Sequence, residues 1–491
     1  MKKTMKKLFT AVLVVTLILS GTLTAFGADT NGIQVQYNGN DIALKDAAKI
    51  VDGRVMVPFR QLLESMGAEV TYDSKAKTIV VKTDEKEMSF AAGGADITII
   101  KDGVTSVKKM EVASFVDKKL SRTYVPVRFI AETMGYSVGW DKGNKTVVII
   151  DPDTLFSNAD VDFSIISKLM KSDLDLEKPY ATTGKFDMDI ATFASPDSIM
   201  PGMEFSMTGQ MSGIQQKSNA DLVMNMAFQF DKMLSKLTVE EKAMMEPMLG
   251  MFKDASMKIK MDGETGITYM NSSLFSALDP TVGANTWYKM NIYDTYEDMG
   301  IDLKSITNMS YSGFKLSEML TASLASMEYA DISTYRDIQS TYVFLKNLIG
   351  DEAFTKKTAG SYVTYNLNIN QTSVLAALAK TALSEGISKD TLDMTELGDM
   401  LNSSKLVAKI MVQEKAGSLY KYELEGDCTF EEIACNFDMT GDQKNAEGQF
   451  TIEQKDVMKM MIEVESHVSE TSTAPDLSLP ADAVIKEYPI Y

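Results

Sequence analysis

Histidine, cysteine and tryptophan are scarce in this chain of 491 residues, which has one, two and two of them. A single histidine, His467, excludes metal centres that need several imidazole ligands, and no G-x-S-x-G segment supplies a nucleophile elbow. Because the two cysteines lack Cys-x-x-Cys spacing, neither a zinc site nor thiol redox catalysis is indicated. We therefore expect no metal, no cofactor and no catalytic residues.

Positive charge is also in short supply. The chain has 49 Lys and Arg against 68 Asp and Glu, which gives a formal net charge of −19. An acidic surface repels phosphate backbones, so nucleic acid is excluded as an expected partner.

The first 27 residues predict a secretory signal peptide. Four lysines precede an apolar segment from Leu8 to Leu19, and Ala25 to Gly27 has the small-x-small form of a cleavage site. Its removal would take away the four lysines and lower the net charge from −19 to −23. No cysteine at that site offers a lipid anchor, and no second apolar stretch is long enough to cross a membrane. We expect a secreted, extracytoplasmic protein, either released or associated with the cell wall.

One segment occurs twice, 68 residues apart. Residues 54–81 and 122–149 align without a gap, and 12 of the 28 aligned positions are identical. Each copy predicts a strand, a helix that begins after Pro58 or Pro126, a glycine that ends the helix, and two further strands. A helix of this kind buries its apolar stripe only against a sheet, so the two copies together predict one α+β domain over residues 31–151.

The V-P-x-R helix start, the E-x-M-G helix end and the D-x-x-x-K-T hairpin, each used twice, resemble the copper amine oxidase N-terminal-like family, a stalk domain of exported bacterial proteins. The resemblance implies an extracytoplasmic α+β module that engages the cell envelope. It does not imply amine oxidation, because that chemistry needs three histidine ligands for copper. Arg60 with Glu64, and Arg128 with Glu132, match the family pattern, and we interpret them as ion pairs that fix the helix.

Residues 152–180 predict a linker with one helix near residues 163–171, and residues 181–491 a second, larger part. Apolar residues alternate with polar ones there, which is the pattern of an antiparallel sheet with one buried face. Helices are expected within residues 230–252, 316–327, 335–348 and 374–383. We expect a large, curved, half-barrel-like antiparallel sheet packed with helices, in an α+β chain overall.

This second part is similar to the LolA-like lipoprotein-carrier proteins. The resemblance rests on strands ending at Tyr269-Met270 and at Trp287 to Met290, and on a closing Leu477 to Pro480. It implies a cavity for a lipid or another apolar small molecule.

The chain has 35 methionines. In a strand, residues two apart face the same side, so the alternating methionines share a side with Phe and Ile and favour a core or an adaptable apolar lining. Cu(I) binding by thioether sulfur is the alternative. The residues expected to line a ligand cavity are Met224, Met226, Phe228, Met257, Ile259, Met261, Met458, Met460 and Ile462.

Cys428 and Cys435 flank a predicted hairpin, where a disulfide or two buried thiols are both compatible with the spacing. The function favoured by these patterns is a non-catalytic envelope protein whose second part binds an apolar ligand or a cell-wall component. The alternatives are a structural spacer, copper binding through methionines and, as the weakest, a hydrolase with two carboxylates.

Overall fold

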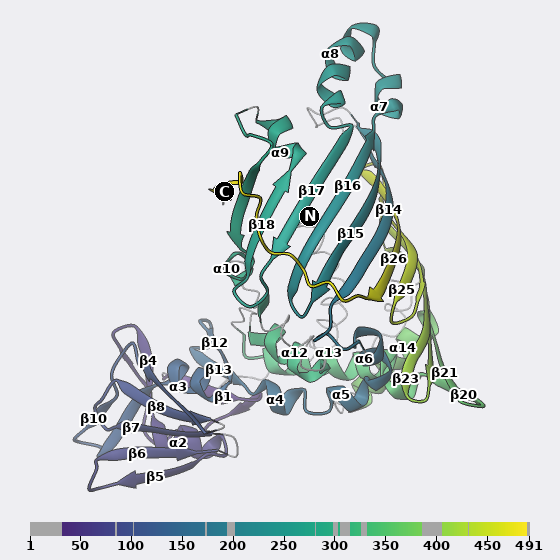
Figure 1. The fold of residues 1–491 in the computed structure, drawn as a ribbon. Helices are drawn as coiled ribbons and strands as arrows, with labels where there is room; N and C mark the ends of the chain where they lie inside the picture. The colour runs from purple at the N-terminus through teal and green to yellow at the C-terminus, as the bar shows by residue number, and fades with distance from the viewer. Residues whose placement is uncertain are drawn as a thin grey trace. The chain divides into compact units, whose positions relative to one another are not determined.

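Figure 1 shows the computed structural model, which describes residues 32–83, 86–101, 103–171, 174–193, 202–279, 281–297, 303–304, 315–325, 331–384, 405–430 and 432–488. The predicted signal peptide lies outside the described residues. Backbone contacts divide the chain into two compact units. Unit 1 comprises residues up to 157 together with 323–343, and unit 2 comprises residues 158–322 and 344–491.

Unit 1 has three sheets, with strand orders β12-β13-β1-β2, β10-β11-β4-β3 and β5-β6-β7-β8-β9. Its strands are β1 (Gln34–Tyr37), β2 (Asn40–Asp41), β3 (Lys49–Val51), β4 (Arg54–Pro58), β5 (Glu69–Asp73), β6 (Thr78–Lys82), β7 (Lys86–Ala91), β8 (Asp96–Lys101), β9 (Val104–Lys109), β10 (Phe115–Asp117), β11 (Arg122–Pro126), β12 (Ser137–Asp141) and β13 (Thr146–Ile150). Its helices include α2 (Phe59–Ser65), α3 (Val127–Met134) and α4 (Pro152–Leu155).

Proline and glycine delimit the helices α2 and α3. Each helix follows a proline with φ near −60°, Pro58 at −62° and Pro126 at −64°, which is the backbone angle that a helix start requires. Gly135 caps α3 with φ 94°, and Gly67 has φ 82° just after α2. Both glycines thus adopt the left-handed conformation predicted from the sequence.

An arginine ties each helix to the strand that follows it. Arg60 Nη1 donates to the Val70 carbonyl at 2.9 Å and lies 3.5 Å from a Glu64 carboxylate oxygen. Arg128 makes the same two contacts, at 3.0 Å to the Val138 carbonyl and 3.3 Å to the carboxylate four residues on. The predicted ion pairs are confirmed, and the hydrogen bond to the strand is the additional contact that holds the helix.

A single hydrophobic core fills unit 1. The apolar stripes of α2 and α3 face the strands, and Leu62, Leu63, Ile130 and Ala131 are all 0% exposed. Burial of this kind contributes about 25 cal/mol per Å² of apolar surface removed from water, and it is the main stabilising contribution for a unit of this size.

Unit 2 is built on a 14-stranded sheet of order β20-β21-β22-β23-β24-β25-β26-β14-β15-β16-β17-β18-β19-β27. All neighbours are antiparallel except β19 and β27, and the sheet is strongly curved (Figure 1). The strands are β14 (Tyr180–Thr192), β15 (Glu204–Gln216), β16 (Asn219–Gln229), β17 (Asp254–Met261), β18 (Ile267–Ser272), β19 (Thr286–Asn291), β20 (Thr355–Ala359), β21 (Tyr362–Asn370), β22 (Lys405–Lys415), β23 (Ser418–Phe430), β24 (Ile433–Gly441), β25 (Asn445–Gln454), β26 (Met458–Glu470) and β27 (Val484–Glu487).

Cross-strand pairs of glycine and an aromatic residue occur within this sheet. Gly209 lies directly opposite Phe186, and Gly426 directly opposite Phe437. A Cβ added to either glycine would come within 2.1 to 2.2 Å of the opposing ring, so each ring occupies the space above a glycine. Glycine allows a sheet to bend sharply, and an aromatic ring from the next strand covers the exposed backbone.

The helices after residue 157 are α5 (Ala159–Asp162), α6 (Ser164–Met170), α7 (Asp231–Ser235), α8 (Val239–Gly250), α9 (Ser273–Leu278), α10 (Ile292–Glu297), α12 (Leu316–Ala325), α13 (Thr334–Ile349) and α14 (Gln371–Ser384), with a 3-10 turn η1 at Asp351–Ala353. The stretch predicted as a linker thus contains α4, α5 and α6. Asp351 accepts hydrogen bonds from the backbone and the hydroxyl at the start of α6, which fixes that helix. None of the described helices combines the length and the apolar character needed to cross a membrane.

The predicted helix at residues 230–252 is two helices, α7 and α8, and α8 does not cover the sheet. None of its residues is buried, and Val239 and Met244 are 81% and 74% exposed. Its apolar residues are spread around the helix axis, with Pro247 inside it, so no stripe exists to pack against the sheet. A capping box between Thr238 and Glu241 stabilises its first turn instead.

Candidate functional site

The residues predicted to line a cavity lie on one face of the 14-stranded sheet. Met224 pairs with Met257, and Met460 pairs with Ile190 on the neighbouring strand β14. Residues directly opposite each other in a sheet point to the same face, so the register alone assigns the side. Strands β16, β17 and β26 therefore contribute their predicted residues to one surface.

Two rows of that surface can be followed across the sheet from one paired residue to the next. The first row is Ile369, Ala408, Gly426, Phe437, Phe450, Ile462, Met188, Met207 and Phe228. The second row is Leu367, Ile410, Leu424, Met439, Gly448, Val464, Phe186, Gly209, Met226 and Ala255. We call the side that bears these rows the apolar face.

Burial changes along the apolar face. At β21 and β22, helix α14 packs on the sheet, and Leu367 and Val412 are 5% and 0% exposed. At β16, β17 and β26 the nine predicted lining residues are all half-buried, and none of them reaches the full burial of a core. Within the described residues, the methionine-bearing half of this face is thus more accessible than the half beneath α14.

The two cysteines belong to the same face. Cys428 on β23 and Cys435 on β24 are directly opposite, and the thiols are not bonded to each other in this structure. Burial raises the pKa of both thiols, and the neighbouring Cys435 and Asp427 raise that of Cys428 further. Their sulfurs are poor nucleophiles near neutral pH, because the thiol form dominates.

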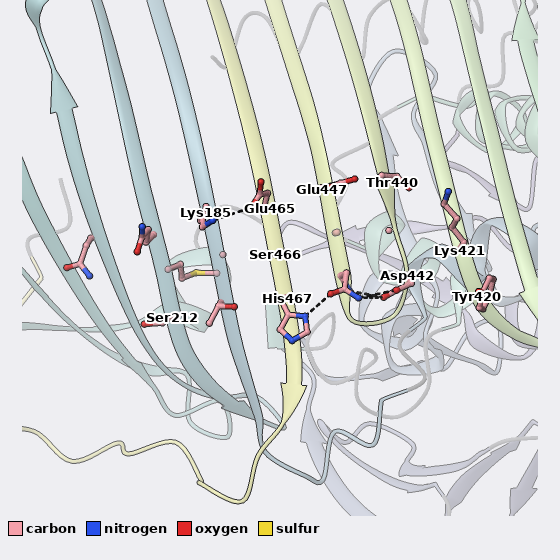
Figure 2. Close-up of a pocket in the computed structure, with 18 residues that line it drawn as sticks. Lys185, Ser212, Tyr420, Lys421, Thr440, Asp442, Glu447, Glu465, Ser466 and His467 are labelled. Atoms are coloured by element: carbon pink, nitrogen blue, oxygen red, sulfur yellow. Dashed lines mark hydrogen bonds and ion pairs between the residues drawn. The ribbon is translucent and has the colours of Figure 1, made fainter.

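The opposite side of the sheet is polar and carries a hollow of about 780 Å³. Figure 2 shows this hollow with the side chains that line it drawn as sticks. Directly opposed residues again form a row, and each member lines the hollow: Asn225, Gln210, Lys185, Glu465, Glu447 and Thr440. Lys185 lies 3.7 Å from Glu465, in an exposed pair worth little stability.

His467 stands at the lower end of this hollow and is exposed, as the sequence predicted. Its Nδ1 lies 2.7 Å from Asn445 Oδ1, and the Asn445 amide donates to both Asp442 carboxylate oxygens at 3.1 Å (Figure 2). Burial alone would raise the pKa of Asp442, but hydrogen bonds from the Lys444 and Asn445 backbone and from the Asn445 amide lower it overall. Asp442 is therefore an ionised anchor for the β24–β25 turn.

Among the described residues, His467 and the acidic side chains do not form a metal site or a nucleophile–base pair. The hydrogen bond of His467 goes to the Asn445 side chain, and among the described residues it has none to a hydroxyl or thiol that it could activate. In the part of the chain that the structure describes, no three His, Cys, Asp or Glu side chains converge as a metal site would require. The arrangement suits binding, with an apolar and a polar surface on opposite sides of one sheet.

The polar hollow was not predicted from the sequence. The only signal for it is the set of polar residues that alternate with the apolar ones along β14, β25 and β26. Alternation assigns these residues to a side of the sheet, but a concavity depends on how the sheet bends, which neighbouring residues along the chain do not report.

No curated protein matches the chain. Among solved structures, two engineered mutants of a Rh. blastica porin share 8% identity with it, cover 59% of it and 99 to 100% of their own length, and have TM-scores of 0.12. A triple mutant of Rhodopseudomonas blastica porin shares 9% identity over 59% of this chain and 99% of its own, also with a TM-score of 0.12. Scores this low carry no argument.

A family model for the copper amine oxidase N-terminal domain matches residues 36–149. The matched region includes both copies of the V-P-x-R pattern, and the domain is not the catalytic part of those oxidases. Residues 36–149 are therefore similar to the N-terminal domain of copper amine oxidases.

Proposed function

We propose that this is an exported, non-catalytic protein of the cell envelope whose unit 2 binds an apolar, lipid-like ligand on the apolar face of its sheet. The observation that carries the proposal is the half-burial of all nine predicted lining residues on one continuous face. Methionine suits such a surface, because its unbranched, polarizable side chain adapts to ligands of varied shape.

The expected affinity follows from the apolar area that a ligand would bury. A ligand that removes about 500 Å² of apolar surface from water contributes about 12 kcal/mol. Association costs at least about 4 kcal/mol, so the remainder corresponds to an affinity near micromolar. A single acyl chain with its headgroup in water matches this scale, as a carrier of the LolA-like kind expected from the sequence would require.

The leader sequence and the N-terminal domain support an envelope location. We propose that residues 1–27 are removed on export, that residues 31–151 form the stalk domain, and that residues 152–180 connect it to the ligand module at 181–491. The two halves of the stalk are proposed copies of one strand-helix-strand-strand plan. In support, β4 and β11 pair about Val57 and Val125, which are corresponding residues of the two copies.

Native mass spectrometry of the mature protein, purified from its own host without detergent, tests the proposal. A bound mass that organic extraction identifies as a lipid supports it. A clean apo mass points to the structural spacer, and an added copper ion points to thioether binding by methionines.

A matched pair of variants assigns any ligand to a side of the sheet. Met226→Glu places a charge on the apolar face, and Asn225→Glu places the same charge on the polar face one residue away. Loss of the bound mass in Met226→Glu alone supports the assignment, whereas retention in both variants contradicts it.

A further inference from the structure

Unit 1 contains a hollow of about 420 Å³ that the apolar-ligand function does not use. Strands β3, β4, β12 and β13, helix α3 and the residue Glu111 surround it. The residues that form its wall are Ile50, Gly53, Arg54, Val55, Glu111, Pro126, Val127, Arg128, Phe129, Glu132, Val138, Gly139, Trp140 and Val147.

Two arginine–carboxylate pairs supply its polar groups. Arg54 Nε lies 2.5 Å from a Glu111 carboxylate oxygen, and Arg128 Nη1 lies 3.3 Å from Glu132. The side chains of both pairs are about half exposed, from 47% to 65%, so their remaining donors and lone pairs are open to a ligand. Each cation has an anion beside it, and the four groups together carry no net charge.

Trp140 supplies an aromatic surface to this hollow. It is half-buried on β12 opposite Val147, and Asp141, the next residue, is held by the β12–β13 turn through Asn144. The backbone that carries the indole is therefore held by the sheet and by the turn. Val55 and Ile50 add branched aliphatic side chains to the same hollow.

We propose that this hollow binds a pyranose ring of a neutral glycan chain. The axial C–H groups of a pyranose form an apolar patch that stacks on an indole face, while its neighbouring hydroxyls match planar, bidentate groups such as guanidinium and carboxylate. An anionic ligand gains little here, because each arginine is already paired. A purely apolar ligand would remove water from the two guanidinium and two carboxylate groups, and their desolvation would cost free energy of binding.

The aliphatic wall makes the expected sugar more specific. An acetamido methyl group is a small apolar projection on an otherwise polar ring, and the exposed Ile50 and half-buried Val55 offer it an apolar contact. N-acetylated sugars should therefore bind better than the same ring with a free hydroxyl. The proposal concerns unit 1 alone and stands independently of lipid binding by unit 2.

Quenching of tryptophan fluorescence by acrylamide tests the proposal on the full mature chain. The chain has two tryptophans, and Trp287 is only 3% exposed, so half-buried Trp140 gives most of the quenchable signal. Chitohexaose should protect Trp140 from acrylamide at lower concentrations than cellohexaose. Protection by neither sugar, or protection by a hexapeptide of glutamate instead, would overturn the proposal.

Variants separate binding from folding. Glu111→Gln keeps the shape of an exposed side chain and should weaken chitohexaose binding about tenfold, the effect of losing one hydrogen bond to a charged group. Trp140→Ala should abolish retention on insoluble chitin, whereas Tyr72→Ala, the corresponding position of the first copy and outside the hollow, should not. Equal retention of the Trp140→Ala and Tyr72→Ala variants would contradict a role for this hollow.

Discussion

Gly209→Ala tests how the large sheet is bent. Gly209 on β15 lies under the ring of Phe186 on β14, and an added Cβ would stand 2.1 Å from the ring Cζ and 2.2 Å from Cε1. Ordinary contact begins at 3.4 Å, so the ring must move by roughly 1.3 Å. Phe186 is half-buried, so its ring has some room to move. After that movement the ring would no longer cover the glycine.

Overpacking of this kind costs about 1 to 3 kcal/mol, and we expect about 2 kcal/mol from the free energy of unfolding of unit 2. The assay is urea unfolding followed by the fluorescence of Trp287, which is buried in unit 2. A Trp140→Phe background removes the tryptophan fluorescence of unit 1, so that the assay reports the unfolding of unit 2 alone.

Two comparisons make the test decisive. Gly250→Ala, at the end of α8, adds a Cβ that meets nothing within 4 Å and should not destabilise the protein, since alanine is the better helix former. In a Phe186→Leu background the penalty of Gly209→Ala should shrink, which a double-mutant cycle measures as coupling. An unchanged unfolding midpoint, or no coupling between the two positions, would refute the reasoning.

Three further outcomes follow from local contacts. Arg60→Ala should destabilise unit 1 by about 1 kcal/mol, because the hydrogen bond to the Val70 carbonyl is lost. The loss should depend little on salt, because the ion pair with Glu64 is exposed. Urea unfolding followed by Trp140 fluorescence in low and high salt measures both effects. Thr238→Ala should cost α8 about 1 kcal/mol by removing its cap, and hydrogen exchange should rise in α8 while the sheet is unaffected. Alkylation of Cys428 and Cys435 by iodoacetamide should be slow at pH 7 and accelerate above pH 9, because raised thiol pKa values keep the reactive thiolate scarce; labelling at pH 7 as fast as that of a model thiol would contradict this.

The features predictable from the sequence are those encoded by neighbouring residues. Pro126 and Gly135 delimit α3 because each restricts or permits a backbone angle at its own position. The alternation of Met224, Met226 and Phe228 likewise assigned a side of the sheet without knowledge of any other strand. These are local properties, and the structure bears them out.

The features that could not be predicted depend on residues far apart in the chain. The contact of His467 with Asn445 requires the register of β25 against β26. The bend of the sheet depends on which strand places a ring over Gly209 or Gly426. The alternation of apolar and polar residues along one strand does not predict which strand pairs with it. Helix α8 shows the converse, because a methionine-rich segment was expected to cover the sheet and its apolar residues do not form a stripe.

Equilibrium titration of a fluorescent fatty acid into the full mature chain tests the central claim most directly. The Asn225→Glu variant should bind it like the unaltered protein, near micromolar affinity. The Met226→Glu variant should bind at least about tenfold more weakly, because covering a carboxylate with an acyl chain costs more than 1.4 kcal/mol. Equal affinities for the two variants would contradict binding on the apolar face.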